Sequence, residues 1–198
     1  MGAGWNEREY RAFGLPFDRR VDRFEEAFTI VRTLLRDGRI THAGAFYRLE
    51  DCVIDPGPAR LGGPPLVLGS IGPRMLSIGL PHVDAWNVWW SQYGNTADGF
   101  AAVKQRVDEA CVAAGRAVGA VAATAAVLIR LPGGHGRLMG DEQGDGIRPI
   151  EGTVAEIADQ LNAFAIVGAS HLQLVVDPIT QASIEALGDV LAALETGY

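Results

Sequence analysis

The sequence has few cysteines, no excess of basic residues and no apolar run of membrane-spanning length. Its two cysteines, Cys52 and Cys111, lie outside any CxxC or Cys/His cluster, which favours a reducing cytoplasmic compartment and gives no sign of a catalytic thiol. The 24 Asp and Glu residues outnumber the 17 Lys and Arg residues, so we expect no nucleic-acid partner, because phosphate backbones are bound by basic surface. Without a signal-peptide core or a bilayer-spanning run, we also expect no membrane partner and a cytoplasmic location.

Recognisable catalytic motifs are equally scarce. The four histidines, His42, His82, His135 and His171, share no metal-ligand spacing with one another or with a carboxylate, so we predict no zinc or iron site. The sequence contains no Ser/His/Asp arrangement, no Walker A loop and no pair of catalytic carboxylates. It therefore identifies no catalytic residue, and a site must be sought among residues that could bind a ligand.

A short apolar strand followed by a glycine turn stands out between residues 64 and 76. The apolar run Leu66–Leu68, bounded by prolines and a glycine, predicts a strand buried on both faces. Gly69 and Gly72 permit a tight turn with positive φ, and Pro73 suits the first position of a helix. The stretch is therefore predicted to be strand, turn and helix start.

This turn is a candidate anion site. The backbone N–H groups of Ser70, Ile71 and Gly72 would lie at the positive end of a helix dipole, where a phosphate can be held. Arg74 could add a charge-assisted contact. The alternative is that the turn only joins a strand to a helix, since every such unit needs one.

Before this stretch, the sequence predicts a helix and a small hairpin. Apolar residues recur at helical spacing over 18–36, with Asp18 as the N-cap and Gly38 as the stop. Loose alternation over 40–55, centred on Gly44, predicts a hairpin outside the main architecture.

After this stretch, strands and helices alternate, which implies right-handed βαβ units and a parallel sheet. Both a doubly wound sheet and a (β/α) barrel satisfy the pattern. The predicted elements are buried strands over 84–90, 122–131 and 171–176, an amphipathic helix over 100–114, a helix opened by the capping box Thr153–Glu156 and closed by Gly168, and a last helix capped by Thr180. The last two helices are expected to bury the stripes Val154, Ile157, Leu161 and Phe164, and Ile184, Leu187, Leu191 and Leu194.

The segment Gly133 to Asp145 is rich in glycine. We expect a mobile or partly disordered loop in which Asp141, Glu142 and Asp145 are solvated. A lid over a site is the alternative interpretation.

The strand over 84–90 ends in a cluster of indoles. Trp86, Trp89 and Trp90 could line an apolar pocket for a planar ring, or they could belong to the core. Because side chains alternate along a strand, Trp86 faces opposite to Asn87 and Trp89, so at least one tryptophan is expected in the core. Asn87, close to the strand end, could make a polar contact with a ligand.

Taken in order, these segments resemble the luciferase-like monooxygenase superfamily, and in particular its F420-dependent class of oxidoreductases. The order and spacing of the matching pieces carry the resemblance over nearly all of the chain. These pieces are Gly2-Ala3-Gly4-Trp5-Asn6-Glu7, Glu9-Tyr10, Ala12 to Phe17, Arg23-Phe24-Glu25-Glu26-Ala27, Gly44 with Tyr47 and Leu49, Pro64-Pro65-Leu66 with Gly69 and Gly72-Pro73-Arg74, Asp84-Ala85-Trp86-Asn87, and the tail from Gly152 through Leu194.

The resemblance implies an α/β fold with parallel strands, namely a TIM (β/α)8 barrel that binds its cofactor at the carboxyl ends of the strands. Within that barrel, Gly2–Trp5 corresponds to the end of the fourth strand. Residues 1–198 are therefore expected to form a single, N-terminally truncated luciferase-like domain, the C-terminal half of the barrel from about the end of strand 4 to strand 8. Half a barrel exposes strand edges, which predicts pairing with another chain, for example as a homodimer.

The resemblance also implies a cofactor and its contacts. The cofactor would be coenzyme F420, with FMN as the alternative, and the substrate a small molecule. A second function stays open, a non-catalytic half-barrel remnant that associates through its exposed edges. The cofactor-binding residues implied are the opening loop Gly2, Gly4, Trp5 and Asn6, the phosphate turn Gly69, Ser70, Ile71 and Gly72 with Arg74, and the pair Trp86 and Asn87.

Overall fold

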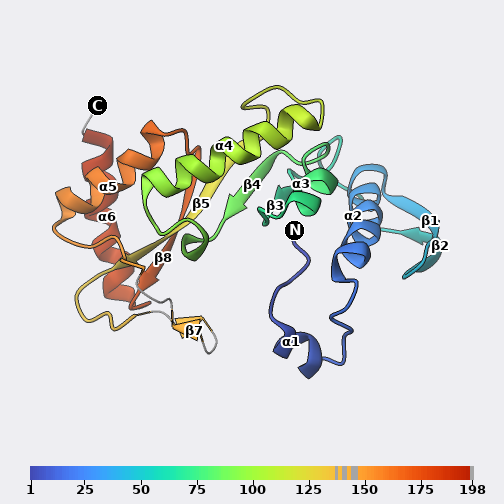
Figure 1. The fold of residues 1–198 in the computed structure, drawn as a ribbon, viewed down its shortest axis with the longest axis horizontal. Coiled ribbons are helices and arrows are strands. Elements are labelled where there is room, and N and C mark those ends of the chain that lie inside the picture. The colour runs from blue at the N-terminus through green and yellow to red at the C-terminus, as the bar shows by residue number, and fades with distance from the viewer. Residues whose placement is uncertain (137, 140–141, 144–146, 197–198) are drawn as a thin grey trace. The chain divides into compact units, whose positions relative to one another are not determined.

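A computed structural model of the protein describes residues 1–136, 138–139, 142–143 and 147–196. The chain divides into two compact units, Met1–Asp84 and Ala85–Tyr198 (Figure 1). The expectation of one luciferase-like domain over the whole chain stays a prediction.

The first unit contains a long helix, an antiparallel hairpin and a strand–helix pair. The predicted helix over 18–36 and the hairpin over 40–55 are both confirmed, whereas the helix α1 was not predicted. Its elements are α1 (Glu7–Ala12), α2 (Arg20–Asp37), β1 (Arg39–Ala43), β2 (Arg48–Val53), β3 (Val67–Leu68) and α3 (Pro73–Gly79).

The ends of α2 differ in how well they were predicted. Gly38 ends the helix as expected, in a left-handed conformation with φ of 77°. The prediction that Asp18 caps the other end is wrong, because the N-cap is Arg19 and no side chain caps the helix. Arg23 lies one turn into α2, and its guanidinium donates to the Asp18 carbonyl at 2.7 Å.

The hairpin β1–β2 is fastened to α2 by one carboxylate. Glu26 accepts hydrogen bonds from the backbone N–H groups of Ala45, Phe46 and Tyr47, at 3.0, 3.0 and 2.7 Å, and lies 3.1 Å from His42 Nε2. A Cβ atom at Gly44 would lie 1.9 Å from the Glu26 carboxylate. A side chain at position 44 would therefore displace the Glu26 carboxylate from the hairpin.

The strand β3 is shorter and more exposed than predicted. Leu68 is fully buried, but the Val67 side chain is 40% exposed, so the expectation of burial on both faces is wrong. Leu68 packs against Gly79 of α3, where a Cβ atom would lie 2.7 Å from it. Within the first unit, α3 thus covers only the face of β3 that carries Leu68.

The second unit is built on three parallel strands with the order β4-β5-β8 (Figure 1). This confirms the predicted alternation of parallel strands and helices. The elements are β4 (Ala85–Val88), the 3-10 helix η1 (Trp90–Gln92), α4 (Ala97–Ala113), β5 (Ala122–Arg130), β6 (Leu138–Met139), β7 (Glu142–Gln143), α5 (Val154–Ile166), β8 (His171–Asp177) and α6 (Gln181–Thr196).

Part of the glycine-rich segment lies outside the described residues. Asp141 and Asp145 are among the residues that the structure does not describe, so their predicted solvation stays a prediction, as does that of Glu142. The short strands β6 and β7 form an antiparallel pair within this segment.

The core of the second unit is aromatic. Trp86 of β4 stacks on Phe100 of α4, with ring centroids 5.7 Å apart, and Tyr93 and Phe164 of α5 pack edge-on nearby. The predicted capping box of α5 is confirmed, since Thr153 and Glu156 cap each other. These contacts place α4 and α5 against the strand face that carries Trp86.

Three expectations about burial in this unit are wrong. Val154, at the first position of α5, is exposed, and the strand β8 is buried only at its carboxyl end. On α6, Ile184 and Leu191 are 60% and 51% exposed, whereas Ser183, Leu187 and Val190 are buried. The predicted burial of Leu187 is confirmed, and packing against the rest of the unit buries Ser183 and Val190 beside it in place of Ile184 and Leu191.

Candidate functional site

The structure brings together the two glycine segments that the resemblance assigns to the cofactor. The Met1 amino group donates to the Val67 carbonyl, and the Gly69 N–H donates to the Met1 carbonyl at 2.8 Å. This is the hydrogen-bond pattern of parallel strands, with Met1 beside β3. A Cβ atom at Gly2 would lie 3.1 Å from the Gly69 carbonyl oxygen. Gly2 and Gly69, far apart in the sequence, are therefore neighbours in the first unit.

The turn after β3 has ordinary backbone angles. Gly72 has φ of −71° and is the N-cap of α3, and neither Gly69 nor Gly72 is among the residues with positive φ. The prediction that these glycines supply positive φ is therefore wrong. A Cβ atom would meet nothing closer than 3.7 Å at Gly69 and 3.9 Å at Gly72, so both positions have room for a side chain.

Backbone N–H groups of this turn are available to a ligand. The Gly72 N–H faces the Ser70 hydroxyl at 3.4 Å, a long hydrogen bond. Among the described residues, the N–H groups of Ser70 and Ile71 have no acceptor. Gly69 is exposed, and Ser70, Ile71 and Gly72 are half-buried. The turn could thus donate to an anion without losing any short hydrogen bond.

Arg74 is already paired with carboxylates of α2. Its guanidinium contacts Asp22 and lies 3.2 Å from Glu25. The hydrogen bond to Asp22 raises the pKa of Arg74 above its usual value, and hydrogen bonds from Arg19 and Arg74 lower the pKa of Asp22. A phosphate at the turn would therefore compete with two carboxylates for Arg74.

The opening loop has both fixed and exposed parts. Gly4 has φ of 75°, and a Cβ atom there would lie 2.9 Å from the Tyr10 ring. Asn6 caps α1, where its side chain accepts from the Arg8 N–H at 3.1 Å. Trp5 lies between them with its side chain 60% exposed. A ligand could reach Trp5, whereas Asn6 already serves as a helix cap.

The two candidates of the second unit have different surroundings. Trp86 is fully buried against Phe100, so it exposes no face to a ligand, and the core interpretation holds for it and for Trp90. Asn87 is half-buried, and its side-chain oxygen lies 2.8 Å from the Thr124 hydroxyl. Its amide N–H groups have no acceptor among the described residues.

Sequence reasoning missed Asn95, a buried side chain of the second unit that makes three hydrogen bonds. It is 4% exposed, and its amide donates to the carbonyls of Leu128 and Arg148 at 2.9 and 3.0 Å while accepting from the Leu128 N–H at 2.9 Å. The dipeptide Gly94-Asn95 is a turn signal, and both residues have positive φ. That signal does not reveal a side chain that clamps the carboxyl-terminal part of β5.

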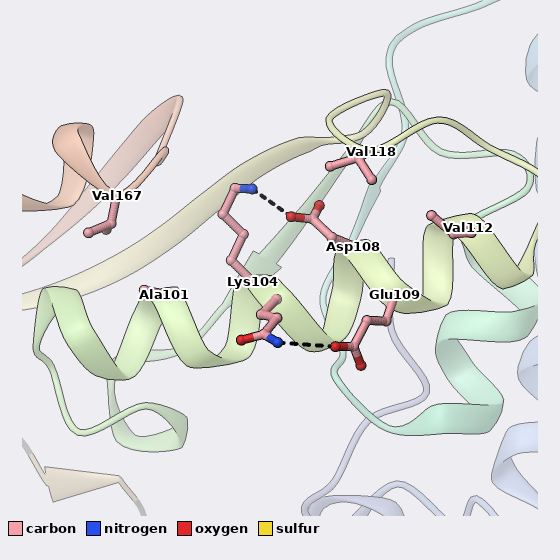
Figure 2. Close-up of a pocket in the computed structure, with 8 residues that line it drawn as sticks. Ala101, Lys104, Asp108, Glu109, Val112, Val118 and Val167 are labelled. Carbon is pink, nitrogen blue, oxygen red and sulfur yellow. Dashed lines mark hydrogen bonds and ion pairs between the residues drawn. The ribbon is translucent and has the colours of Figure 1, made fainter.

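A groove lies along α4, and no predicted cofactor residue is among those that line it (Figure 2). Its volume is about 300 Å³, and it runs past the ion pair Lys104–Asp108, with 2.7 Å between nitrogen and oxygen, toward Val112 and Val118. Gln105 hydrogen-bonds Glu109 at 3.2 Å beside it. Lys104 is neutralised by Asp108, and the remaining charge is the Glu109 carboxylate, so the groove offers no free cation to a phosphate.

The described part of the chain has neither a membrane-spanning helix nor a metal cluster. None of its helices is long and apolar enough to cross a bilayer. It contains no group of three or more His, Cys, Asp or Glu side chains arranged to hold a metal ion.

Solved structures with the same architecture define the class of fold. A coenzyme F420-dependent tetrahydromethanopterin reductase from Methanopyrus kandleri superposes with a TM-score of 0.71 at 15% identity, covering 96% of this chain and 71% of the reductase. An F420-dependent secondary alcohol dehydrogenase, solved with an F420-acetone adduct, gives 0.74 at 16% identity, covering 98% and 68%. A riboflavin lyase with modified FMN gives 0.71 at 18% identity, covering 94% and 60%. The chain thus has the fold of part of these larger proteins.

The sequence itself matches the luciferase-like monooxygenase family over residues 1–131. The chain belongs to this family, and its mixed α/β fold is that of a partial luciferase-like TIM barrel. No curated protein matches the sequence.

Proposed function

We propose that the protein is an oxidoreductase that uses coenzyme F420, with FMN as the alternative cofactor, and acts on a small organic substrate. The observation that carries the proposal is the contact between Met1–Gly2 and Gly69. It places the two segments to which the family resemblance assigns the cofactor side by side. Family membership supports the same reaction class, and the cytoplasmic location stays a prediction.

The first unit fits the phosphate of such a cofactor. The N–H groups of Ser70 and Ile71 have no acceptor within the described residues, and the turn leads into α3 with Pro73 at its first position. Backbone N–H groups in this position suit an anion. The exposed indole of Trp5, in the neighbouring segment, could cover an apolar ring. When bound, the cofactor would supply hydride transfer, or oxygen activation in the case of FMN, while these residues hold and orient it.

The test is titration of the chain with F420 and with FMN, followed by absorbance and ring fluorescence. We expect Gly72→Asp to weaken cofactor binding about tenfold, because it places a carboxylate within a few ångströms of the phosphate. Gly72→Asn is the matched control, since it has the same shape without the charge. Either side chain can cap α3, and at an N-cap the exchange with glycine changes stability by only a few tenths of a kcal/mol.

Two results would contradict the proposal. One is the absence of any spectral change with either cofactor in the unmodified chain. The other is equal affinity in the aspartate and asparagine variants, which would mean that the turn only joins β3 to α3.

A second candidate is a non-catalytic half-barrel that self-associates, for example as a homodimer. Exposed apolar side chains on the second unit favour it, namely Ile166, Ile179, Ile184 and Leu191. Sizing chromatography with light scattering separates the candidates. A monomer that retains F420 or FMN would contradict this one, whereas a cofactor-free oligomer would contradict the first.

A further inference from the structure

A polar cavity of about 290 Å³ lies in the first unit. Arg32 and Arg36 of α2, Pro64 and Leu66 before β3, and His82 and Asp84 after α3 contribute to its lining. Among the described residues that line it, none belongs to the turn at residues 69–72. The cavity is therefore distinct from the proposed cofactor turn.

The acidic groups around this cavity are already engaged. Asp84 accepts the Leu66 N–H at 2.7 Å. Asp37, the neighbour of Arg36, accepts from both Nε and Nη2 of that arginine at 2.7 Å. Among the described residues, no carboxylate forms an ion pair with Arg32. Arg32 therefore has no carboxylate within ion-pair distance among the described residues, although its charge helps to lower the pKa of Asp37.

The guanidinium of Arg32 also has an unused donor. Its Nη1 lies 3.0 Å from His82 Nδ1, but its Nε is buried and has no hydrogen-bond partner. Buried donors without a partner are rare in folded proteins and indicate an ion or water that would satisfy them. A planar guanidinium is well matched to oxygen pairs of phosphates and carboxylates.

We infer that this cavity binds a small oxyanion, the phosphate or carboxylate group of a metabolite, through Arg32. The oxyanion would accept from the Arg32 guanidinium, and Pro64 and Leu66 would contact the attached carbon atoms. The volume is at the lower end of that found for small-molecule pockets, which suits a ligand of this size. The inference does not depend on the proposed redox function.

The experiment is calorimetric titration of the full chain with inorganic phosphate and, separately, with acetate, at constant ionic strength. The probe that binds identifies the oxyanion. Arg32→Gln should weaken its binding about tenfold, the effect of losing one charge-assisted hydrogen bond. Arg48→Gln, on the exposed strand β2, should leave the affinity unchanged.

A second measurement keeps the test valid if Arg32→Gln does not fold. In the unmodified chain, saturating phosphate or acetate should shift the ring resonances of His82 in the NMR spectrum more than those of His42. The inference is overturned if neither probe binds saturably. That result would mean that Arg32 only complements the carboxyl-terminal dipole of α2. It is also overturned if Arg74→Gln abolishes binding while Arg32→Gln does not.

Discussion

Replacing Asn95 should strongly destabilise the second unit, because its side chain is both buried and fully hydrogen-bonded. It makes three hydrogen bonds with Leu128 and Arg148 while 4% exposed, and its backbone has φ of 57°. In Asn95→Ala, the buried N–H of Leu128 loses its acceptor, which costs about 1 to 3 kcal/mol. Holding alanine in a left-handed conformation adds about 1 to 2 kcal/mol. We therefore expect a loss of about 2 to 5 kcal/mol in the free energy of unfolding.

Two further variants separate these contributions. Asn95→Gly removes the same hydrogen bonds but tolerates positive φ, so it should be about 1 kcal/mol more stable than Asn95→Ala. Asn95→Asp keeps the shape and the acceptor for the Leu128 N–H, but it places a carboxylate against two carbonyl oxygens. It should be destabilised at neutral pH and recover as the pH falls, because the protonated acid can donate again.

The assay is urea denaturation followed by circular dichroism and tryptophan fluorescence. Gln105→Ala, on the exposed surface of α4, is the control and should change stability by less than about 0.5 kcal/mol. A loss below about 1 kcal/mol in Asn95→Ala, or equal losses in the alanine and glycine variants, would refute the reasoning about hydrogen bonds or about strain.

Three further predictions concern the caps and carboxylates. Burial raises the pKa of Glu26, but hydrogen bonds from Tyr47, Phe46, His42 and Ala45 outweigh it and lower the pKa below the usual value. The protection of the hairpin from hydrogen exchange should therefore be lost as the pH falls through this lowered pKa. Glu26→Gln should remove that pH dependence. Thr153→Ala should destabilise the second unit by about 1 kcal/mol in urea denaturation, and an unchanged midpoint would mean that the capping box is not formed in solution. Asp22→Asn combined with Glu25→Gln should release Arg74 and strengthen F420 binding in the fluorescence titration; weaker or unchanged binding would mean that Arg74 does not contact the cofactor.

Local signals in the sequence determined much of the fold. Pro73 after a glycine turn, the capping pair Thr153 and Glu156, and Gly38 at a helix end all act within a few residues of the chain. The apolar periodicity of α4 and the apolar run of β5 are also local, and they predicted an amphipathic helix and a buried strand there. The cofactor segments were identified by resemblance, and their roles stay predictions.

Only the tertiary structure decided which groups meet across long stretches of chain. Gly2 lies beside Gly69, Arg74 is held by Asp22 and Glu25, and Asn95 clamps β5. On α6, helical spacing allows two stripes, and packing buried the one with Ser183 while leaving Ile184 exposed. Periodicity reports which residues share a face of an element, whereas the choice between faces depends on non-local contacts that no window of the sequence contains.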